Sequence, residues 1–283
     1  MNSNNFITFD IEEWFHANYD GVDSSVFESQ STNLESNVDR LIDICDSYNI
    51  KSTCFILGDV AKNKPYIVKK LFEAGHEIAS HGSSHKLIYP MNPEEFRTDL
   101  KASSAVLEQI TGKQVVGFRA PSWSVKRETL PWFYAVLAQE GFTYSSSVYP
   151  AKNTLFGISD FPDTPHYPVS SSVLEIPQSV MNLFGNRVGY AGGGYLRFFP
   201  KWLIQRQIRQ KNREDKPVFI YVHPREIDIH QPRLKLGTMD GYFHYQGIAG
   251  CEEKLSALVK EFQPTFIRMD EYAKKVQAEG LLI

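Results

Sequence analysis

Two kinds of hydrophobic pattern alternate along the 283-residue chain. Short runs rich in β-branched and aromatic residues predict strands, and segments with apolar residues three and four positions apart predict helices. The predicted strands are 6–11, 52–57, 76–80, 115–120, 142–146, 174–177 and 217–223. The predicted helices are 33–48, 65–73, 93–110, 128–140 and 200–211, and a final helix, strand and helix occupy 250–279. This alternation is typical of a parallel α/β fold.

Turn residues mark where these elements end. Asn92 followed by Pro93 is typical of a helix start, and Gly75 and Gly112 lie just after two predicted helices. Residues 147–173 are rich in Pro, Ser and Asp without a clear period, so we expect a loop there. The sequence contains no internal repeat, low-complexity tract or charged linker, which favours a single domain.

Polar residues stand where four of the predicted strands end. These residues are Asp10, His81, Arg119 and His223. Two parallel folds fit the alternation, an open doubly wound sheet and a closed (β/α) barrel. In a barrel the carboxyl ends of all strands meet at one mouth, where residues far apart in the sequence come together. The placement of the four polar residues therefore favours the barrel.

The segment HGSSH places two imidazoles, those of His81 and His85, four positions apart. On a helical turn this spacing brings both onto one face, close enough to hold one cation. Alone, the pair is weak evidence, because the same spacing also occurs on solvated surfaces. Here it follows an apolar strand, and Gly82, Ser83 and Ser84 predict a small, tight turn instead of an exposed helix. This context favours metal binding.

A catalytic site of the zinc type needs a third protein ligand and an open position for water. On a strand, Asp10 and Glu12 point to the same side because side chains alternate with a period of two. Two carboxylates aimed into an apolar fold repel each other unless a cation neutralises them. One would then bind the metal and the other act as a base, with Glu13 as the alternative ligand. Solvated acids on an exposed edge strand are disfavoured by the neighbouring aromatic residues.

Arg119 and His223 suit two further tasks at the same mouth. A guanidinium at Arg119 would pair with the free carboxylate and keep it ionised and oriented. His223 follows an apolar strand, and the ordinary pKa of histidine, near neutrality, suits a general acid. A surface Arg and a structural His are the alternatives for these two residues. The other histidines have no such neighbours and stay unassigned: His16, His76, His166, His230 and His244.

Composition limits the classes of partner. The chain has 30 Lys and Arg against 33 Asp and Glu, and both signs of charge are spread along it. We therefore expect no nucleic-acid partner and no binding to anionic membranes, since both need a basic patch or stripe. No stretch approaches the roughly 20 apolar residues of a membrane span, and the N-terminal residues lack the apolar run of a signal peptide. These features predict a cytoplasmic protein.

The three cysteines are Cys45, Cys54 and Cys251, an odd number without a close pair. Cys45 falls in a helical pattern and Cys54 in a strand pattern, so both are expected to be small buried hydrophobes in a reducing compartment. Neither lies beside a His or at a Gly-rich turn, which argues against a catalytic cysteine.

The segments TFDIEE, HGSSH, RAPSW and YVHP, in this order, resemble motifs of the polysaccharide deacetylases of carbohydrate esterase family four, the NodB-homology fold. The match spans about residues 6–225. It implies an α/β fold, a distorted (β/α)7 barrel, whose members remove N- or O-acetyl groups from sugars with a bound divalent metal, commonly zinc. It also implies that Asp10 is the base and that Glu12, His81 and His85 are the metal ligands.

The resemblance assigns three more roles and contains one departure. It implies that Arg119 orients Asp10, that the backbone N–H of Ser122 helps to bind the oxyanion, and that His223 is the acid. The family often has an Asp that tunes this His where the present chain has Ser145. We expect another acid, such as Glu226 or Asp228, to take that task.

Later segments, NLFGNRVGYAGGGYLRFFP and HPREIDIHQPRL, resemble a narrower subgroup of these deacetylases. Its members are encoded with exosortase-type and other exopolysaccharide or capsule assembly systems. The resemblance implies one deacetylase domain over residues 1–283, with a subgroup-specific C-terminal extension from about residue 226. It also implies an association with polysaccharide assembly machinery.

Together these features predict a metal-dependent hydrolase that removes an N-acetyl group from an amino sugar of a surface polysaccharide or its precursor. Trp14, Trp123 and Tyr195 are expected to stack on sugar faces, with packing in the core or at the rim as the alternative for each. Two His and one carboxylate suit zinc, and cobalt, nickel, manganese or iron fit the same ligands. The competing functions are an allantoinase-like hydrolase that opens a cyclic amide and an inactive sugar-binding relative.

Overall fold

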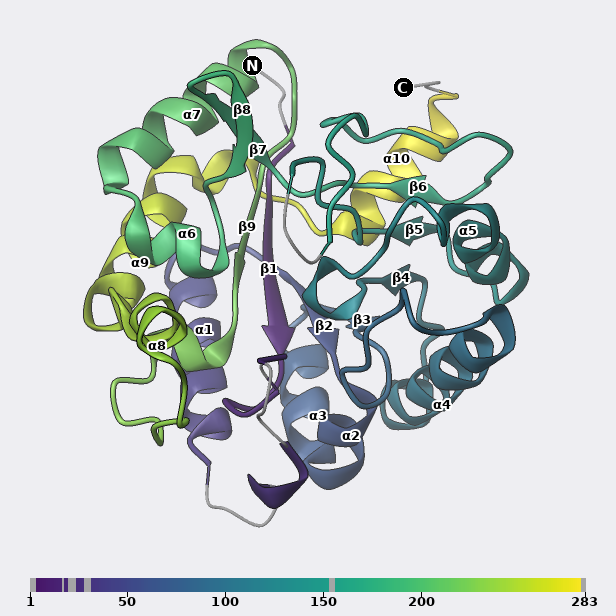
Figure 1. The fold of residues 1–283 in the computed structure, drawn as a ribbon, viewed down its shortest axis with the longest axis horizontal. Coiled ribbons are helices and arrows are strands. Elements are labelled where there is room, and N and C mark those ends of the chain that lie inside the picture. Colours follow the sequence, from purple (N-terminus) through teal and green to yellow (C-terminus); the bar gives the residue numbers. More distant parts are fainter. Residues whose placement is uncertain (1–3, 17, 20–23, 28–31, 153–155, 281–283) are drawn as a thin grey trace.

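The computed structural model describes residues 4–16, 18–19, 24–27, 32–152 and 156–280. Within them, seven parallel strands form one curled sheet in the spatial order β6-β5-β4-β3-β2-β1-β9 (Figure 1). The strands are β1 (Phe6–Ile11), β2 (Thr53–Ile56), β3 (Glu77–Ser80), β4 (Gly117–Phe118), β5 (Tyr144–Ser145), β6 (Leu174–Glu175) and β9 (Phe219–Val222). The sheet is a half-barrel in a single α/β domain, which confirms the predicted (β/α)7 fold class.

Helices surround the sheet, and most of them cover its outer face. The longer ones are α1 (Leu34–Ser47), α3 (Pro65–Glu73), α4 (Pro93–Thr111), α5 (Leu130–Gln139), α7 (Lys201–Arg213), α9 (Cys251–Phe262) and α10 (Met269–Ala278). The shorter α-helices are α2 (Gly58–Asn63), α6 (Gly193–Phe198) and α8 (Thr238–Tyr245). Single 3₁₀ turns are η1 (Ser24–Phe27), η2 (Pro121–Trp123), η3 (Pro224–Ile227), η4 (Ile248–Gly250) and η5 (Gln263–Thr265).

Strand β1 is buried on both of its faces, and its side chains alternate between two cores. Ile7, Phe9 and Ile11 pack outward in the large cluster shared with the helices. Phe6 belongs to a second cluster inside the half-barrel, together with Phe55, Tyr144, Leu174 and Phe219. This period of two turns Asp10 to the interior as well, because it is an even number of positions from Phe6.

The start and end of α4 confirm the turn signals in the sequence. The Asn92 side chain accepts hydrogen bonds from the backbone N–H groups of Glu94 and Glu95, and the Glu95 carboxylate accepts one from Asn92 N. This reciprocal capping box satisfies backbone donors that the helix leaves free. At the other end Gly112 adopts φ +65°, a conformation that glycine reaches without steric cost.

Several elements were missed or misassigned from the sequence. The predicted strand between the last two helices is wrong, since only a single bridge joins Asn5 to Phe266. The antiparallel hairpin of β7 (Val180–Leu183) and β8 (Asn186–Gly189) was missed. Its two turn residues, Phe184 and Gly185, both have positive φ. Turns of this kind usually have the sequence Asn-Gly, and phenylalanine seldom takes a positive φ. The sequence Phe-Gly therefore did not indicate a hairpin.

The glycine-rich segment before α7 lies beside the edge strand β9. Gly192 pairs with Tyr221, and a Cβ at Gly192 would lie 1.9 Å from the Tyr221 ring. At the opposite end of the half-barrel from the β1 arrowhead, α10 packs against the starts of the strands (Figure 1). Met269 N donates to Thr53 Oγ1 and Asp270 N to the Glu77 carboxylate.

All three cysteines are buried and free, which confirms the predicted burial of Cys45 and Cys54. Among the described residues, no helix combines the length and the apolar character that crossing a bilayer requires. The acidic and basic side chains lie mainly at the surface, while the few buried ones gather in specific hydrogen-bonded groups.

We expect Gly117→Ala to lower the free energy of unfolding by about 1–3 kcal/mol, because its Cβ would overpack the core. The added Cβ would lie 2.1 Å from the Tyr144 hydroxyl, which donates to the buried Glu77 carboxylate. Urea denaturation measures the change. Gly250→Ala is the control, since no atom lies within 4 Å of a Cβ there. Equal stability of the two variants would contradict the packing argument.

Candidate active site

The carboxyl ends of β1, β3, β4 and β9 meet at one edge of the curled sheet. Polar residues stand at or just after these ends, as the sequence predicted: Asp10, Glu12, His81, Arg119 and His223. His223 has a side chain that is 15% exposed, and the others are almost completely buried. Because the strands are parallel and curl together, their terminal side chains converge on one small volume.

Glu12, His81 and His85 form a group that could hold a metal ion. One ligand atom from each lies within 4.8 Å of the others. Glu12 Oε2 is 2.9 Å from His85 Nε2 and 3.9 Å from His81 Nε2. This carboxylate oxygen is buried without a hydrogen bond of good geometry. Since such an oxygen is costly to bury alone, and two imidazoles with a carboxylate suit a divalent cation, the residues fit a metal.

Neighbouring groups orient both imidazoles. His81 Nδ1 lies 2.8 Å from the Arg119 carbonyl, to which it donates, so its Nε2 lone pair is free toward Glu12. Burial lowers the pKa of His81 to about 4, which keeps the ring neutral, the form that binds metals. The Asn18 amide lies 3.1 Å from His85 Nδ1 and also donates to Ser122 Oγ.

The segment between the two histidines is a tight turn and not a helix. The chain bends at Ser83 and Ser84, and the residues on either side of the bend have positive φ, +79° at Gly82 and +57° at His85. Ser83 N donates to Asp99 Oδ2, and the Gly82 carbonyl accepts from Gly58 N. The tight turn predicted from the small residues is confirmed, and the backbone at His85 is strained to place its ring.

Arg119 binds Asp10 inside the barrel. Its Nη1 donates to Asp10 Oδ1 over 2.6 Å and to Thr8 Oγ1 over 2.8 Å. Other guanidinium nitrogens donate to the backbone carbonyl and the hydroxyl of Ser146. The guanidinium also lies 4.0 Å from the centre of the Phe55 ring. These contacts fix the carboxylate, and its second oxygen, Oδ2, lies 3.8 Å from His223 Nε2.

His223 is paired with Glu226 in the following turn η3. Glu226 Oε2 accepts from His223 Nδ1 over 3.2 Å and from His223 N over 3.1 Å. Burial disfavours the charged imidazole, but Glu12 and Glu226 outweigh this effect and raise the pKa of His223. Arg197 donates to the other oxygen of Glu226 over 3.1 Å and so holds the carboxylate in place.

The two alternative acids named for the His223 partner are thus separated by geometry. Glu226 contacts the imidazole, whereas Asp228 accepts from the Asn33 side chain. Ser145, where the family often has an Asp, lies buried in β5 and donates to Ser147 Oγ. The sequence named two acids as partners for His223, and in the structure Glu226 is the one that forms the hydrogen bond.

Ser122 and Trp123 lie in the turn η2 directly after Arg119. Both have left-handed backbones, with φ of +52° and +55°. Side chains with a Cβ rarely adopt this conformation, and such strain gathers at functional sites. The position beside Asn18 and His85 is compatible with the predicted oxyanion role of the Ser122 N–H, which stays a prediction.

The three aromatic residues predicted to stack on sugars differ in position. Trp14 is 4% exposed and packs edge-on against Phe15, and Trp123 is 7% exposed and stacks on Phe219. Because both indoles are buried, little of either ring is available to stack on a sugar. Core packing was the alternative expected for these residues. Tyr195 is partly exposed, and its hydroxyl lies 3.2 Å from that of Tyr149.

Other residues near the site were misjudged or missed. Glu13, the alternative ligand, instead accepts from Lys64 over 2.6 Å. His16, left unassigned, stacks on His85 with ring centres 6.1 Å apart. Arg225 Nε lies 3.8 Å from Glu12 Oε1. The position of Arg225 directly after the motif YVHP was the available signal, whereas nothing in the sequence singled out Asn18.

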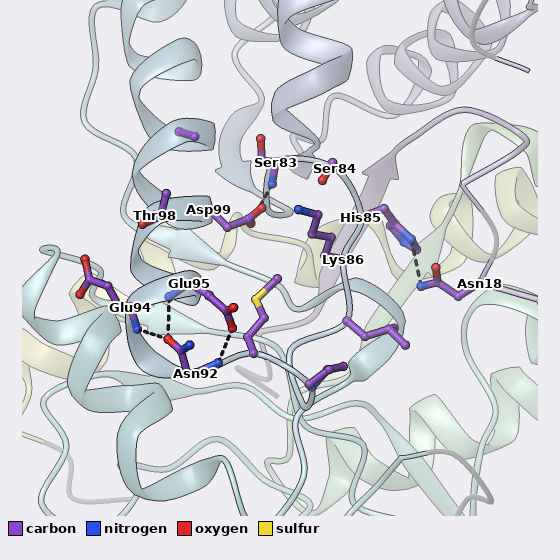
Figure 2. Close-up of a pocket in the computed structure, with 14 residues that line it drawn as sticks. Asn18, Ser83, Ser84, His85, Lys86, Asn92, Glu94, Glu95, Thr98 and Asp99 are labelled. Carbon is purple, nitrogen blue, oxygen red and sulfur yellow. Dashed lines mark hydrogen bonds between the residues drawn. The ribbon is translucent and has the colours of Figure 1, made fainter. Parts of the chain in front are cut away.

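A cavity of about 960 Å³ adjoins the site. Figure 2 shows His85 and Asn18 on one side of it and the start of α4, with Asn92, Glu94 and Glu95, on another. The lining mixes amides, hydroxyls and carboxylates with apolar residues. This volume lies at the upper end of the roughly 300–1,000 Å³ of ordinary ligand pockets.

Comparisons with known families divide the chain into two matches. Residues 7–144 match the family model described as polysaccharide deacetylase. Residues 146–274 match a second model, described as a domain of unknown function, DUF3473. The residues of the metal group lie in the first match, whereas His223 and Glu226 lie in the second. The site therefore draws on both.

Two curated relatives match part of the chain. A peptidoglycan deacetylase-like protein of Gibberella zeae, FGM2, is 34% identical over 113 residues, or 39% of this chain and 32% of that protein. A peptidoglycan-N-acetylglucosamine deacetylase of Bacillus cereus is 29% identical over 93 residues, or 33% of this chain and 34% of that protein. The chain thus spans about a third of the length of these relatives.

Solved structures share the fold over nearly the whole chain. A Mycobacterium smegmatis protein assigned as a polysaccharide deacetylase is 21% identical with a TM-score of 0.68, covering 99% of this chain and 93% of that one. Puue allantoinase is 16% identical with a TM-score of 0.65, covering 96% and 89%. Such low identities establish the fold alone. Residues 7–144, which match the polysaccharide deacetylase model, supply the first strands of the half-barrel, and strands of the second match complete it.

Proposed function

We propose that this protein is a metal-dependent hydrolase that removes an N-acetyl group from an amino sugar of a surface polysaccharide or its precursor. The proposal rests on three groups of side chains that lie together at the carboxyl ends of the strands. They are the possible metal ligands Glu12, His81 and His85, the Asp10–Arg119 pair and the His223–Glu226 pair. The family match and the deacetylase names of the curated relatives support the same reaction.

The metal-ligand group and Asp10 would serve the attack on the amide. A divalent cation held by Glu12, His81 and His85 would lower the pKa of a water molecule and polarise the substrate carbonyl. Asp10, held in place by Arg119, takes the proton from the attacking water. The Ser122 N–H donates a hydrogen bond to the oxyanion that develops on the substrate.

His223 serves the departure of the amine. A free amine anion is a very poor leaving group, so the nitrogen must receive a proton as its bond to carbon breaks. His223 Nε2, which lies 3.8 Å from Asp10, donates this proton. The other ring nitrogen, Nδ1, keeps its own proton because it donates a hydrogen bond to Glu226. Arg197 prevents Glu226 from turning away, since it binds the second carboxylate oxygen. Acetate and the free amino sugar result.

Two competing functions are less well supported. An allantoinase-like reaction on a cyclic amide rests on shared fold alone, because the allantoinase structure is only 16% identical. An inactive sugar-binding relative would usually have lost a metal ligand or the base. Here the ligand group and the Asp10 carboxylate are all present and close together. The partner that seemed to be missing at Ser145 is replaced by Glu226.

The proposal includes finer expectations about the metal and the pathway. Zinc suits the two imidazoles and one carboxylate best, and cobalt, nickel, manganese or iron fit the same set. The later segments of the sequence favour a role in exopolysaccharide or capsule assembly, with a subgroup-specific extension from about residue 226. Three free, buried cysteines are consistent with a cytoplasmic location.

We expect His81→Ala and His85→Ala to lose bound metal and acetate release together, because each removes one ligand of the group. Elemental analysis of the purified variants and acetate release from N-acetylated saccharides, with and without chelator, measure both losses. His230→Ala, at an exposed histidine, is the matched control and should keep both. Full turnover in the two ligand variants would make the metal assignment wrong.

Asp10→Asn should retain the metal but lower turnover about 10²- to 10⁴-fold, because an amide cannot accept the proton from water. Metal content by elemental analysis and kcat for acetate release separate the two effects. Loss of bound metal in this variant would instead identify Asp10 as a ligand.

Glu226→Gln should lower kcat about 10- to 100-fold with little change in KM or metal content, because a neutral amide no longer stabilises the charged imidazole. Asp228→Asn is the matched control, since this nearby acid binds Asn33 and not His223. Steady-state kinetics on both variants decide the matter. An equal effect of the two substitutions would exclude a specific role for Glu226.

A further inference from the structure

Helices α6, α7 and α8 lie on one side of the molecule (Figure 1), and five of their large apolar side chains are exposed. They are between 51% and 65% exposed and form what we call the aromatic patch: Phe198, Trp202, Met239, Tyr242 and Phe243. Ring contacts join Phe198 to Phe243 and Phe243 to Tyr242. Clustered apolar exposure of this kind marks surfaces that bind another molecule.

The polarity of α8 is the reverse of that of an ordinary surface helix. Its histidine, His244, is 1% exposed and lies 3.1 Å from the Tyr19 hydroxyl on the inner side. Met239, Tyr242 and Phe243, spaced three and four positions apart, face outward. A helix that only covers a core would bury the apolar residues and expose the histidine. The sequence of α8 therefore fits an apolar environment on its outer side.

Buried contacts hold this orientation in place. Arg197, which is almost fully buried, donates to the backbone carbonyls of Phe243, His244 and Gln246 at the end of α8. The same guanidinium binds Glu226 beside His223. The aromatic patch is thus fixed to the wall of the candidate active site and is not the result of a loosely packed helix end.

Basic side chains adjoin the aromatic patch. Helix α7 carries five Lys or Arg residues and no acidic residue: Lys201, Arg206, Arg209, Lys211 and Arg213. Two more exposed basic residues, Arg233 and Lys235, precede α8, which itself contains one acid, Asp240. Arg209 and Lys211 form ion pairs with acids of the protein. Within the described part of the chain, Lys201 and Arg206 form none, so their charge is available to a partner.

We propose that the aromatic patch and its basic neighbours bind the surface of an anionic lipid membrane. Aromatic rings favour the boundary between lipid headgroups and acyl chains, and Lys and Arg attract anionic headgroups. The small net charge of the chain led us to expect no such binding, but the charges of α7 are all of one sign. The inference goes beyond the proposed deacetylase activity and does not depend on it.

Membrane docking would also favour substrates that lie at the membrane surface. His244 of α8 lies 3.4 Å from Arg225, which in turn is 3.8 Å from Glu12. The aromatic patch and the candidate site are therefore joined by two side chains. A protein held on a bilayer through α8 keeps its catalytic mouth close to saccharides that are carried at the membrane surface.

Co-sedimentation of the full chain with vesicles tests the proposal. We expect binding to phosphatidylcholine vesicles containing about 30% phosphatidylglycerol, weaker binding to pure phosphatidylcholine, and a loss of binding as salt increases. The double variant Tyr242→Ser, Phe243→Ser should bind the anionic vesicles about tenfold or more weakly. Tyr66→Ser, at an exposed tyrosine on α3, is the matched control and should bind normally.

Three results would overturn the proposal. They are no binding to anionic vesicles, equal binding of the double variant, and an equal loss in the Tyr66→Ser control. A dimer in light scattering that the double variant dissociates, without vesicle binding, would assign the patch to a second copy of the chain instead. Circular dichroism checks that the double variant is folded. Its acetate release from a soluble saccharide should match the unmodified protein, which separates this test from that of the proposed activity.

Discussion

The buried guanidinium of Arg119 is the contact on which the arrangement of the site depends. It binds Asp10 and Thr8 of β1 and Ser146 just after β5, and it lies against the Phe55 ring of β2. An unpaired charge at this depth would be strongly destabilising, so the strands must keep the positions that satisfy it. The Arg119 carbonyl also accepts from His81. One residue therefore couples the packing of the half-barrel to Asp10 and to the group of side chains that could hold a metal ion.

The second half of the chain completes this arrangement from the other side of β1. Strand β9 pairs with β1 and brings His223 to the mouth, and the turn η3 supplies Glu226. Arg197 then ties Glu226 to the end of α8. The polysaccharide deacetylase match ends at residue 144, but neither the sheet nor the site is complete without the residues that follow. The two matched segments form one structural unit around one site.

Much of the fold and of the site could be predicted because the signals are local. The alternation along β1, the Asn92 capping box and the small residues of HGSSH each depend on a few neighbouring positions. Steric and hydrogen-bonding rules act on such short segments in nearly any context. Placing polar residues at strand ends then predicted which distant side chains would meet, since parallel strands that curl together share one mouth.

By itself, the sequence determined the order of the seven sheet strands, the barrel class and the residue types at the mouth. Only the tertiary structure decided between partners of similar chemistry. Glu226 and Asp228 are both acids close to His223 in the sequence. In the turn η3 and just after it, Glu226 binds the imidazole and Asp228 binds Asn33. Likewise the sequence left Trp123 either to stack on a sugar or to pack in the core, and in the structure it packs on Phe219. Such choices depend on which side chains, distant in sequence, occupy the same space, and no local rule contains that information.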